Sequence, residues 1–457
     1  MTAPLWTSSE IAQATGGTAS TEFTVTGVTF DSREVGPGDL FVAMPGTAFD
    51  GHQFVAGAFA AGAAAALVSQ PVDGPHVLVA DTAAALQALG RAARDRSTAT
   101  IIGVTGSVGK TSTKEALADS LERSHPGRVH RSVKSYNNHT GVPLSLARMP
   151  RDASFAVLEM GMSNAGEIAA LTAQVRPHVA LITAIAPAHI ETLGSEEAIA
   201  DAKGEIFQGL EPDGVAIIPN DSPHRDRLVK AARRHADRIV SFGSGDADVH
   251  AVHSVRASSG GSLITAGLLD SDLTFTISQR GDHWVSNALA VLAAVEAVGG
   301  DAALAGLALA DFGGLKGRGA RHMVPLGDGE LLLIDESYNA NPASMAATLK
   351  SLGGEQGVTR RIAVLGPMRE LGQHGDALHA GLAPAVLGAK VDRLNLIGDE
   401  LAPLADALDG RVPLDRASGV DAAIALVLAD LRPGDAILVK ASNSVGLARL
   451  VERVAGA

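Results

Sequence analysis

The stretch TIIGVTGSVGKTSTKEALADSL, residues 100–121, joins a short apolar run to a glycine-containing loop and then to a segment with apolar positions at helical spacing. Strand, loop and helix in this order are typical of a phosphate-binding loop, where backbone N–H groups at a helix N-terminus hold phosphate oxygens. The general pattern G-x-x-x-x-G-K-[S/T] requires glycine where this chain has Val104. All other parts are present, so the sequence predicts a nucleotide site rather than a glycine turn with an exposed lysine.

We expect this loop to bind a nucleoside triphosphate together with Mg²⁺. A lysine supplies charge for the outer phosphates, and a Ser or Thr hydroxyl contacts the ion. The predicted nucleotide-binding residues of the loop are Thr105, Gly106, Ser107, Val108, Gly109, Lys110 and Thr111. Mg²⁺ also needs a carboxylate, and Glu159 follows the apolar run FAVL at the predicted carboxyl end of a strand, the edge where α/β sheets bind ligands.

Two further residues each have two interpretations. His189 follows the apolar run HVALITAI, residues 178–185, which places it near the same edge, yet a loop histidine is more often structural or solvated. Lys203 lies in the acidic segment SEEAIADAKGEIF, where periodicity alone indicates a surface lysine with i,i+4 partners.

The composition excludes several classes of protein. The 457 residues include 37 basic and 50 acidic side chains, with no run of Lys or Arg that would favour nucleic acid, and no cysteine for disulfides, thiolate metal sites or nucleophiles. No run of 18 apolar residues and no leader-like start is present. We therefore expect a cytoplasmic protein with no membrane insertion and no nucleic-acid partner.

The chain length and the alternation of apolar runs with helical segments predict an α/β protein of three domains. Residues 1–84 form a small mixed α/β domain, including a helix predicted over the alanine-rich residues 54–67. Residues 85–312 form a central P-loop domain with a largely parallel, doubly wound sheet. Residues 313–457 form a Rossmann-like domain without a G-x-G-x-x-G turn, so no dinucleotide is implied.

Four motifs in this order resemble the Mur ligase superfamily of ATP-dependent amide-forming enzymes: TGSVGKTS (105–112), EMG (159–161), AHIE (188–191) and AKGEI (202–206). The loop of that family also lacks the first glycine of the general pattern. The resemblance implies ATP and Mg²⁺ as cofactors and a carbamylated lysine at position 203. It implies catalytic roles for Lys110, Lys203, His189 and Glu159. It also implies metal ligands in Thr111, Glu159, His189 and carbamylated Lys203, with His189 as the ligand of a second metal ion.

Other motifs extend the resemblance over nearly the whole chain. Residues 29–55 resemble the UDP-sugar domain shared by the members that add a diamino acid or a dipeptide, and SYNNHTGVPLSL (135–146) resembles the segment that meets the incoming muropeptide. The substrate residues implied are Ser32, Arg33, Gly46, Thr47, Asn137, Asn138, Thr140, Tyr338, Asn339 and Asn341. The further nucleotide residues implied are His283 and Asn287 for adenine, Arg318 for the phosphates, and Asp335 as a ribose or hinge aspartate.

The motif IDESYNANP (334–342) is similar to that of the members that add D-alanyl-D-alanine, and no Asn-Pro-Arg motif of the diaminopimelate-adding members is present. The resemblance implies a monomeric ligase that joins D-alanyl-D-alanine to UDP-N-acetylmuramoyl-tripeptide through an acyl phosphate, in peptidoglycan precursor synthesis. The alternatives are a diamino-acid-adding or folylpolyglutamate synthase-like ligase, or a non-catalytic nucleotide switch. Three positions depart from the family pattern: Pro367 replaces an acidic residue, Asn443 an arginine, and Trp284 a small amide.

Overall fold

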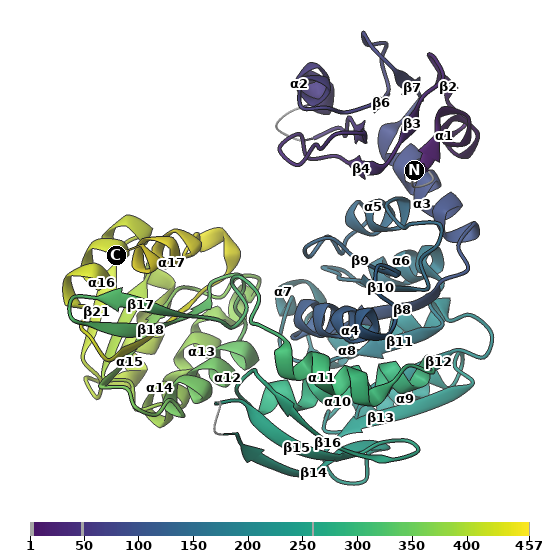
Figure 1. Ribbon diagram of the computed structural model, residues 1–457. Coiled ribbons are helices and arrows are strands. Elements are labelled where there is room, and N and C mark those ends of the chain that lie inside the picture. The colour runs from purple at the N-terminus through teal and green to yellow at the C-terminus, as the bar shows by residue number, and fades with distance from the viewer. Residues whose placement is uncertain (1–3, 47–49, 258–259, 457) are drawn as a thin grey trace.

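The computed structural model describes residues 4–46, 50–257 and 260–456 and has three α/β units, each built around its own main sheet (Figure 1). The α/β fold class predicted from the sequence is confirmed. Among the described residues, no helix is long and apolar enough to cross a membrane.

The first unit is a five-stranded sheet in the order β2-β7-β6-β5-β4. Its strands are β2 (Thr18–Ala19), β4 (Gly27–Thr29), β5 (Asp39–Val42), β6 (Ala65–Val68) and β7 (His76–Leu78); α1 (Ser8–Thr15), η1 (Gly51–Phe54), α2 (Val55–Ala60) and the pair β1 (Trp6–Thr7) and β3 (Thr24–Val25) complete it. The helix predicted over residues 54–67 is wrong in its second half, where the chain enters β6. All four β6 residues are buried in the middle of the sheet, and tertiary burial overrides the helix propensity of alanine there.

The second unit carries the phosphate-binding loop on a nine-stranded sheet in the order β16-β15-β14-β13-β12-β11-β8-β10-β9. Its strands are β8 (Thr100–Thr105), β9 (Val129–Arg131), β10 (Phe155–Glu159), β11 (Val179–Ile182), β12 (Val215–Pro219), β13 (Arg238–Gly243), β14 (Val249–Arg256), β15 (Ser262–Gly267) and β16 (Asp272–Ile277). The predicted parallel sheet is confirmed from β9 to β14. It is wrong for β15 and β16, which add antiparallel neighbours at one edge.

Helices cover both faces of this sheet, and apolar side chains fill the space between them in two core clusters. They are α4 (Lys110–Ser124), α5 (Gly141–Ala147), α6 (Glu167–Val175), α7 (Ile190–Leu193), α8 (Glu196–Gly204), η2 (Glu205–Gly209), α9 (Arg225–Ala232), α10 (Asp282–Ala297) and α11 (Ala302–Asp311). Helix α3 (Thr82–Asp95) instead contributes to the core of the first unit and packs against α5. Strand β8 lies between β11 and β10, so the loop that follows it leaves the sheet where the strand order changes direction, the usual ligand position in α/β sheets.

The third unit is a six-stranded sheet in the order β17-β18-β22-β19-β20-β21, parallel except for β17. Its elements are β17 (Ala320–Leu326), β18 (Gly329–Glu336), α12 (Pro342–Gly353), β19 (Arg360–Leu365), η3 (Gly372–His374), α13 (Gly375–Ala380), α14 (Ala383–Gly388), β20 (Arg393–Ile397), η4 (Asp399–Leu401), α15 (Ala402–Leu408), β21 (Leu414–Ala417), α16 (Val420–Asp430), β22 (Asp435–Lys440), η5 (Asn443–Val445) and α17 (Ala448–Ala455).

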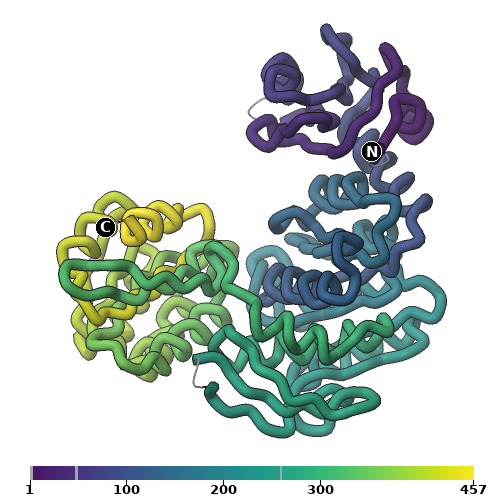
Figure 2. The backbone as a smooth tube through the Cα atoms, in the orientation of Figure 1, coloured from purple at the N-terminus to yellow at the C-terminus, as the bar shows by residue number. Residues whose placement is uncertain are grey.

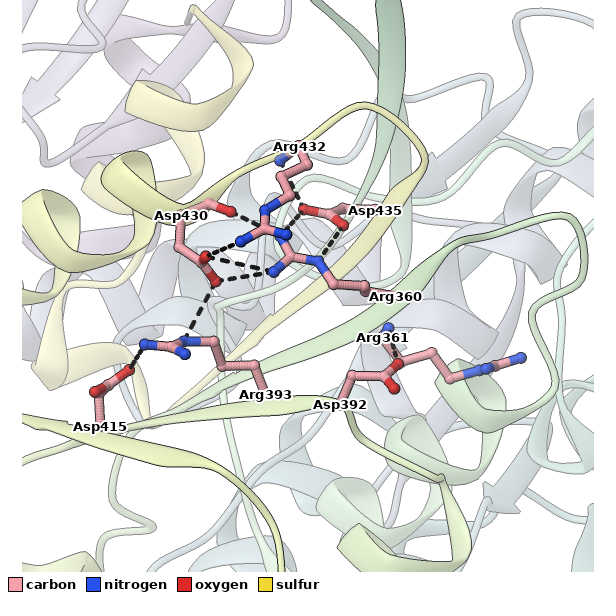
Figure 3. A network of polar contacts seen from close by, with 8 residues as sticks. All are labelled: Arg360, Arg361, Asp392, Arg393, Asp415, Asp430, Arg432 and Asp435. Carbon is pink, nitrogen blue, oxygen red and sulfur yellow. Dashed lines mark hydrogen bonds and ion pairs between the residues drawn. The ribbon is translucent and has the colours of Figure 1, made fainter.

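A network of arginines and aspartates ties the amino ends of the strands in the third unit (Figure 3). Arg360, the first residue of β19, donates to both oxygens of Asp435, the first residue of β22, at 2.9 and 2.7 Å. Arg393, the first residue of β20, reaches Asp430 and Asp415. This end of the sheet is opposite the carboxyl ends of the strands, where ligands bind in such sheets, so we assign the network to stability.

The second unit lies between the other two (Figures 1 and 2). Helix α3 leads from the first unit into the second, and its Arg94 donates to the backbone oxygens of Val175 and Arg176, both at 2.8 Å. The predicted boundary after residue 84 falls inside α3, and that after residue 312 falls just beyond α11. The division of the chain into three domains at these residues stays a prediction.

Candidate active site

A cavity of about 630 Å³ lies where the phosphate-binding loop of the second unit faces the third unit. Its size is within the range of small-molecule sites. The predicted residues that line it are Ser107, Val108, Gly109, Lys110, Thr111, Asn137, Asn138, Glu159, His189, His283, Asn287, Arg318, Tyr338, Asn339 and Asn341. Residues more than 200 positions apart in the sequence therefore meet at one site.

The loop has the backbone shape that a phosphate cradle requires. Helix α4 begins after Gly109, whose φ of 82° is left-handed and suits glycine. A Cβ at Gly106 would lie 2.0 Å from Oγ1 of Thr183, so only glycine fits there. Lys110 Nζ donates to the backbone oxygen of Gly106 at 2.7 Å. Burial lowers the pKa of Lys110, against the opposing charge of Glu159. The predicted Thr105 is completely buried behind the loop.

Glu159 is held at the carboxyl end of β10 by two neighbours that were also predicted to be site residues. Thr111 Oγ1 donates to one carboxylate oxygen at 2.8 Å, and Asn137 Nδ2 donates to the other at 2.7 Å. The residue is 1% exposed, so its position is fixed by these bonds. Asn137 therefore orients the carboxylate in this structure, a contact that its predicted substrate role does not describe.

Lys203 is buried, with 1% of its surface exposed, and is not the surface lysine that periodicity indicates. Burial, followed by the charge of Lys110, holds the pKa of Lys203 well below its usual value of 10.5. Within residues 4–46, 50–257 and 260–456, no hydrogen bond or ion pair compensates its amine. An amine in these surroundings is favoured in its neutral, nucleophilic form.

His189 lies between β11 and α7 with a φ of 60°, a left-handed conformation that is uncommon outside glycine. Its Nδ1 contacts the carboxylate of Glu370, which belongs to the third unit. This contact, followed by opposing desolvation, lowers the pKa of Glu370. Glu370 was missed by the sequence analysis, although it lies three residues after the unusual Pro367.

The donor set fits a magnesium ion carried by a nucleotide. It consists of the Thr111 hydroxyl, the Glu159 carboxylate and the His189 imidazole, with Lys203 buried nearby. In the described part of the chain, no three His, Cys, Asp or Glu side chains cluster closely enough to hold an ion alone. Mg²⁺ usually keeps one or two carboxylates and takes its other oxygens from phosphates and water, so this incomplete set is the expected one.

Helix α10 carries the predicted adenine residues. His283 and Asn287 lie on α10, and burial lowers the pKa of His283, which keeps the ring neutral for hydrogen bonding. Asn287 lies against the phosphate-binding loop, since a Cβ on Gly109 would be 2.9 Å from its Oδ1. Trp284, the departure from the family pattern, is buried and packs on Phe312 with ring centroids 5.4 Å apart.

The junction between the second and third units is ordered around Asp335. One oxygen of this buried carboxylate accepts from Gly317 N at 2.7 Å and the other from Ser337 Oγ at 2.6 Å. Asp335 therefore fits the hinge alternative better than contact with a ribose. The guanidinium of Arg318 lies 4.0 Å from the centroid of the Tyr338 ring, and the Tyr338 hydroxyl contacts Ser135 of the second unit.

The last residues of β18 and β22, Glu336 and Lys440, also line the cavity and were not predicted. Lys440 Nζ contacts Glu336 at 3.2 Å and donates to the oxygen of Asn339 at 3.0 Å. The signal for Lys440 was a lysine ending the apolar strand AILVK. Asn341 caps α12 by accepting from Ser344 N at 2.9 Å, so its amide has a structural role in addition to lining the cavity.

The predicted substrate residues of the first unit are not brought to this cavity. Arg33 is exposed and binds both oxygens of Asp31, at 2.8 and 2.6 Å. Ser32 and Gly46 lie in the same unit, Thr140 precedes α5, and Thr47 lies outside the described residues. The segment before α5 does connect the units, because Tyr136 donates to Glu34 at 3.4 Å.

Comparison with known proteins agrees with these features. Three family models match: "Mur ligase family, catalytic domain" at residues 24–98, "Mur ligase middle domain" at 104–295, and "Mur ligase, glutamate ligase domain" at 323–443. The chain is 36% identical to a UDP-N-acetylmuramoyl-tripeptide–D-alanyl-D-alanine ligase of Synechocystis, over 95% of this chain and 93% of the relative. It is also 36% identical to the ligase of that name from Bacillus subtilis, over 93% and 92%.

Solved structures are similar over the same extent. The crystal structure of MurF from Acinetobacter baumannii has a TM-score of 0.85 and 30% identity, with both chains covered completely. MurF ligase from Thermotoga maritima in complex with ADP has a TM-score of 0.78 and 26% identity, over 94% of this chain and 97% of that one. With its motifs, its cavity and its whole length matched in this way, the chain belongs to the Mur ligase family.

Proposed function

We propose that this chain is an ATP-dependent, ADP-forming ligase that joins D-alanyl-D-alanine to UDP-N-acetylmuramoyl-tripeptide, giving the UDP-linked pentapeptide of peptidoglycan precursor synthesis. The observation that carries this proposal is the full-length similarity to ligases of that name, together with a cavity lined by the motif residues Tyr338, Asn339 and Asn341. The enzyme acts in the cytoplasm as a monomer.

The chemistry begins with activation of a carboxylate. The terminal carboxylate of the UDP-linked tripeptide is a poor electrophile and must be activated. One of its oxygens attacks the γ-phosphate of ATP in line, which forms an acyl phosphate and releases ADP. The amine of the dipeptide then attacks the acyl carbon, and phosphate leaves as the amide forms. No side chain of the enzyme has to act as the nucleophile.

The residues of the cavity have separate roles in this reaction. The phosphate-binding loop and Lys110 hold the outer phosphates, and His283 and Asn287 hold the base. Thr111, Glu159, His189 and Lys203 as its carbamate would hold Mg²⁺ ions, one carried by the nucleotide and a second one at His189. These ions would supply positive charge beside the transferring phosphoryl group. The neutral amine that burial favours at Lys203 is the form that reacts with carbon dioxide, so the surroundings of Lys203 support the carbamate.

The three units divide the substrates among them. The first unit binds the UDP-sugar through Ser32, Arg33, Gly46 and Thr47, the second binds ATP, and the third binds the dipeptide. In the third unit, Pro367 stands where the family pattern has an acidic residue, and Asn443 stands where it has an arginine. Lys440 is a cation of the cavity that can take part in holding the dipeptide carboxylate.

A phosphate-release assay tests the proposal. With ATP and Mg²⁺ present, release should require both the UDP-linked tripeptide and D-alanyl-D-alanine, and single amino acids such as diaminopimelate or glutamate should not replace the dipeptide. Requirement for a diamino acid or glutamate would instead assign the chain to another ligase of the family. Release without either substrate would identify a nucleotide switch.

A further inference from the structure

We propose that Glu370 is a positioning residue that orients His189 across the boundary between the third and second units and so couples the cation site to the seating of the third unit. This inference rests on the proposed function, in which His189 is a cation ligand. The two residues come from different sheets: His189 follows β11, and Glu370 follows β19.

The first observation is the contact itself. The Glu370 carboxylate meets Nδ1 of His189, which leaves Nε2 as the ring nitrogen available to a cation. Histidine ligands commonly donate their second ring N–H to a carboxylate, which fixes both the tautomer and the orientation of the ring. Here the carboxylate in ion-pair contact with Nδ1 belongs to the third unit.

The second observation is the backbone around the contact. His189 has a φ of 60° and Glu370 a φ of 62°, both left-handed in residues with a Cβ. Such conformations are strained and persist where the surroundings determine them. The backbone N–H of Glu191 also donates to the backbone oxygen of Glu370 at 3.4 Å. A backbone contact and a side-chain contact therefore join the segments that carry His189 and Glu370.

The third observation is apolar packing at the same place. Ile190, the residue after His189, packs against the core clusters of both the second and the third units. Gly372 approaches so closely that a Cβ there would lie 2.9 Å from Cγ of Glu191. The α7 segment is thus fixed to both units, and a displacement of the third unit changes the surroundings of His189.

The consequence is a reciprocal coupling. If the seated third unit orients His189 for a cation, then cation binding must favour the seated arrangement by the same free energy. The second cation would be held tightly only when the third unit, which binds the dipeptide, is in place. The negative charge of the phosphates would then be fully neutralised only in the assembled complex.

The test is a titration of the full-length chain with Mn²⁺ in saturating ADP, followed by electron paramagnetic resonance, which counts bound ions without turnover. In the parent chain we expect one ion with the nucleotide and a second, weaker one. Glu370→Ala should weaken the second site about 10- to 100-fold and leave the first unchanged. Glu370→Gln keeps an accepting oxygen but loses the charge. The affinity of its second site for Mn²⁺ should therefore lie between that of the parent chain and that of Glu370→Ala.

Two further variants separate the possible failures. Glu400→Ala removes an exposed carboxylate that pairs with Arg369 beside Glu370, and it should leave both ions unchanged. His189→Ala should abolish the second site; if it does not, the cation role of His189 in the proposed function is wrong. If His189→Ala removes the site but Glu370→Ala leaves it unchanged or tightens it, only the positioning role is overturned.

Discussion

Lys110, which lines the cavity, and Lys203, which is buried near it, have different surroundings. Lys110 donates to a backbone oxygen of its own loop, whereas Lys203 is buried near it and pairs with no carboxylate among the residues that the structure describes. Two ammonium groups so placed repel each other, and conversion of Lys203 to a carbamate would replace this repulsion with attraction. The chemistry of the site therefore depends on the state of one buried side chain.

Substitution of Lys203 tests this dependence. Lys203→Ala should lower kcat at least about 100-fold, because the phosphoryl group would lose part of the charge that stabilises its transfer. Steady-state phosphate release measures the effect, and Lys230→Ala on α9, where the lysine is exposed, provides the matched control. Activity of Lys203→Ala within a few-fold of the control would contradict the carbamate assignment.

At the scale of elements, strand β9 is tied to helix α5 by one side chain. His130 Nε2 lies 2.7 Å from the backbone oxygen of Ser145 and donates to it. Burial lowers the pKa of His130 to about 4, from an ordinary value of 6.5. The neutral ring therefore helps to hold β9, the edge strand of the central sheet, against α5.

The pKa of His130 predicts how stability responds to acid. Between pH 6.5 and pH 4 the unfolded chain holds this proton and the folded chain does not, so stability falls as the pH falls through that window. The parent chain should lose about 3 kcal/mol more than His130→Gln between pH 7 and pH 4, measured by urea unfolding. Equal losses in the two chains would show that His130 carries no such penalty.

The elements were predictable to different degrees. The order of apolar run, glycine loop and amphipathic segment at residues 100–121 predicts β8, the loop and α4 because local chemistry alone requires them. The alanine-rich residues 54–67 mislead, since a run that is apolar on every side suits a buried strand as well as a helix. The strands β15 and β16 were missed although residues 272–277 alternate strictly between polar and apolar, a strand signal that the sequence analysis did not use.

For the whole molecule, the decisive contacts join units that are distant in sequence. Glu355 of the third unit is 2% exposed and binds Arg321 of its own unit at 2.8 Å and Arg280 of the second unit. With Glu370 against His189 and Tyr338 against Ser135, it fixes how the two units face each other. Motifs predicted half of the residues that line the cavity, but these partners could not be predicted because pairing across units leaves no local pattern.

Removal of the Glu355 charge should loosen this arrangement. Glu355→Gln leaves two guanidinium groups without a carboxylate, and burial already lowers the pKa of Arg321, so we expect a loss of about 3 kcal/mol in the free energy of unfolding. Glu452→Gln, which breaks the exposed pair with Lys316, should cost less than about 1 kcal/mol. Urea unfolding compares the two, and equal effects would contradict a bridging role for Glu355.

The most direct test of the ligase assignment follows the oxygen of the activated carboxylate. UDP-N-acetylmuramoyl-tripeptide labelled with ¹⁸O in its terminal carboxyl group is incubated with ATP, Mg²⁺, D-alanyl-D-alanine and the full-length chain in unlabelled water. Mass spectrometry should show one ¹⁸O in each phosphate released and a UDP-linked pentapeptide in equal amount. Unlabelled phosphate, with no pentapeptide formed, would contradict the account.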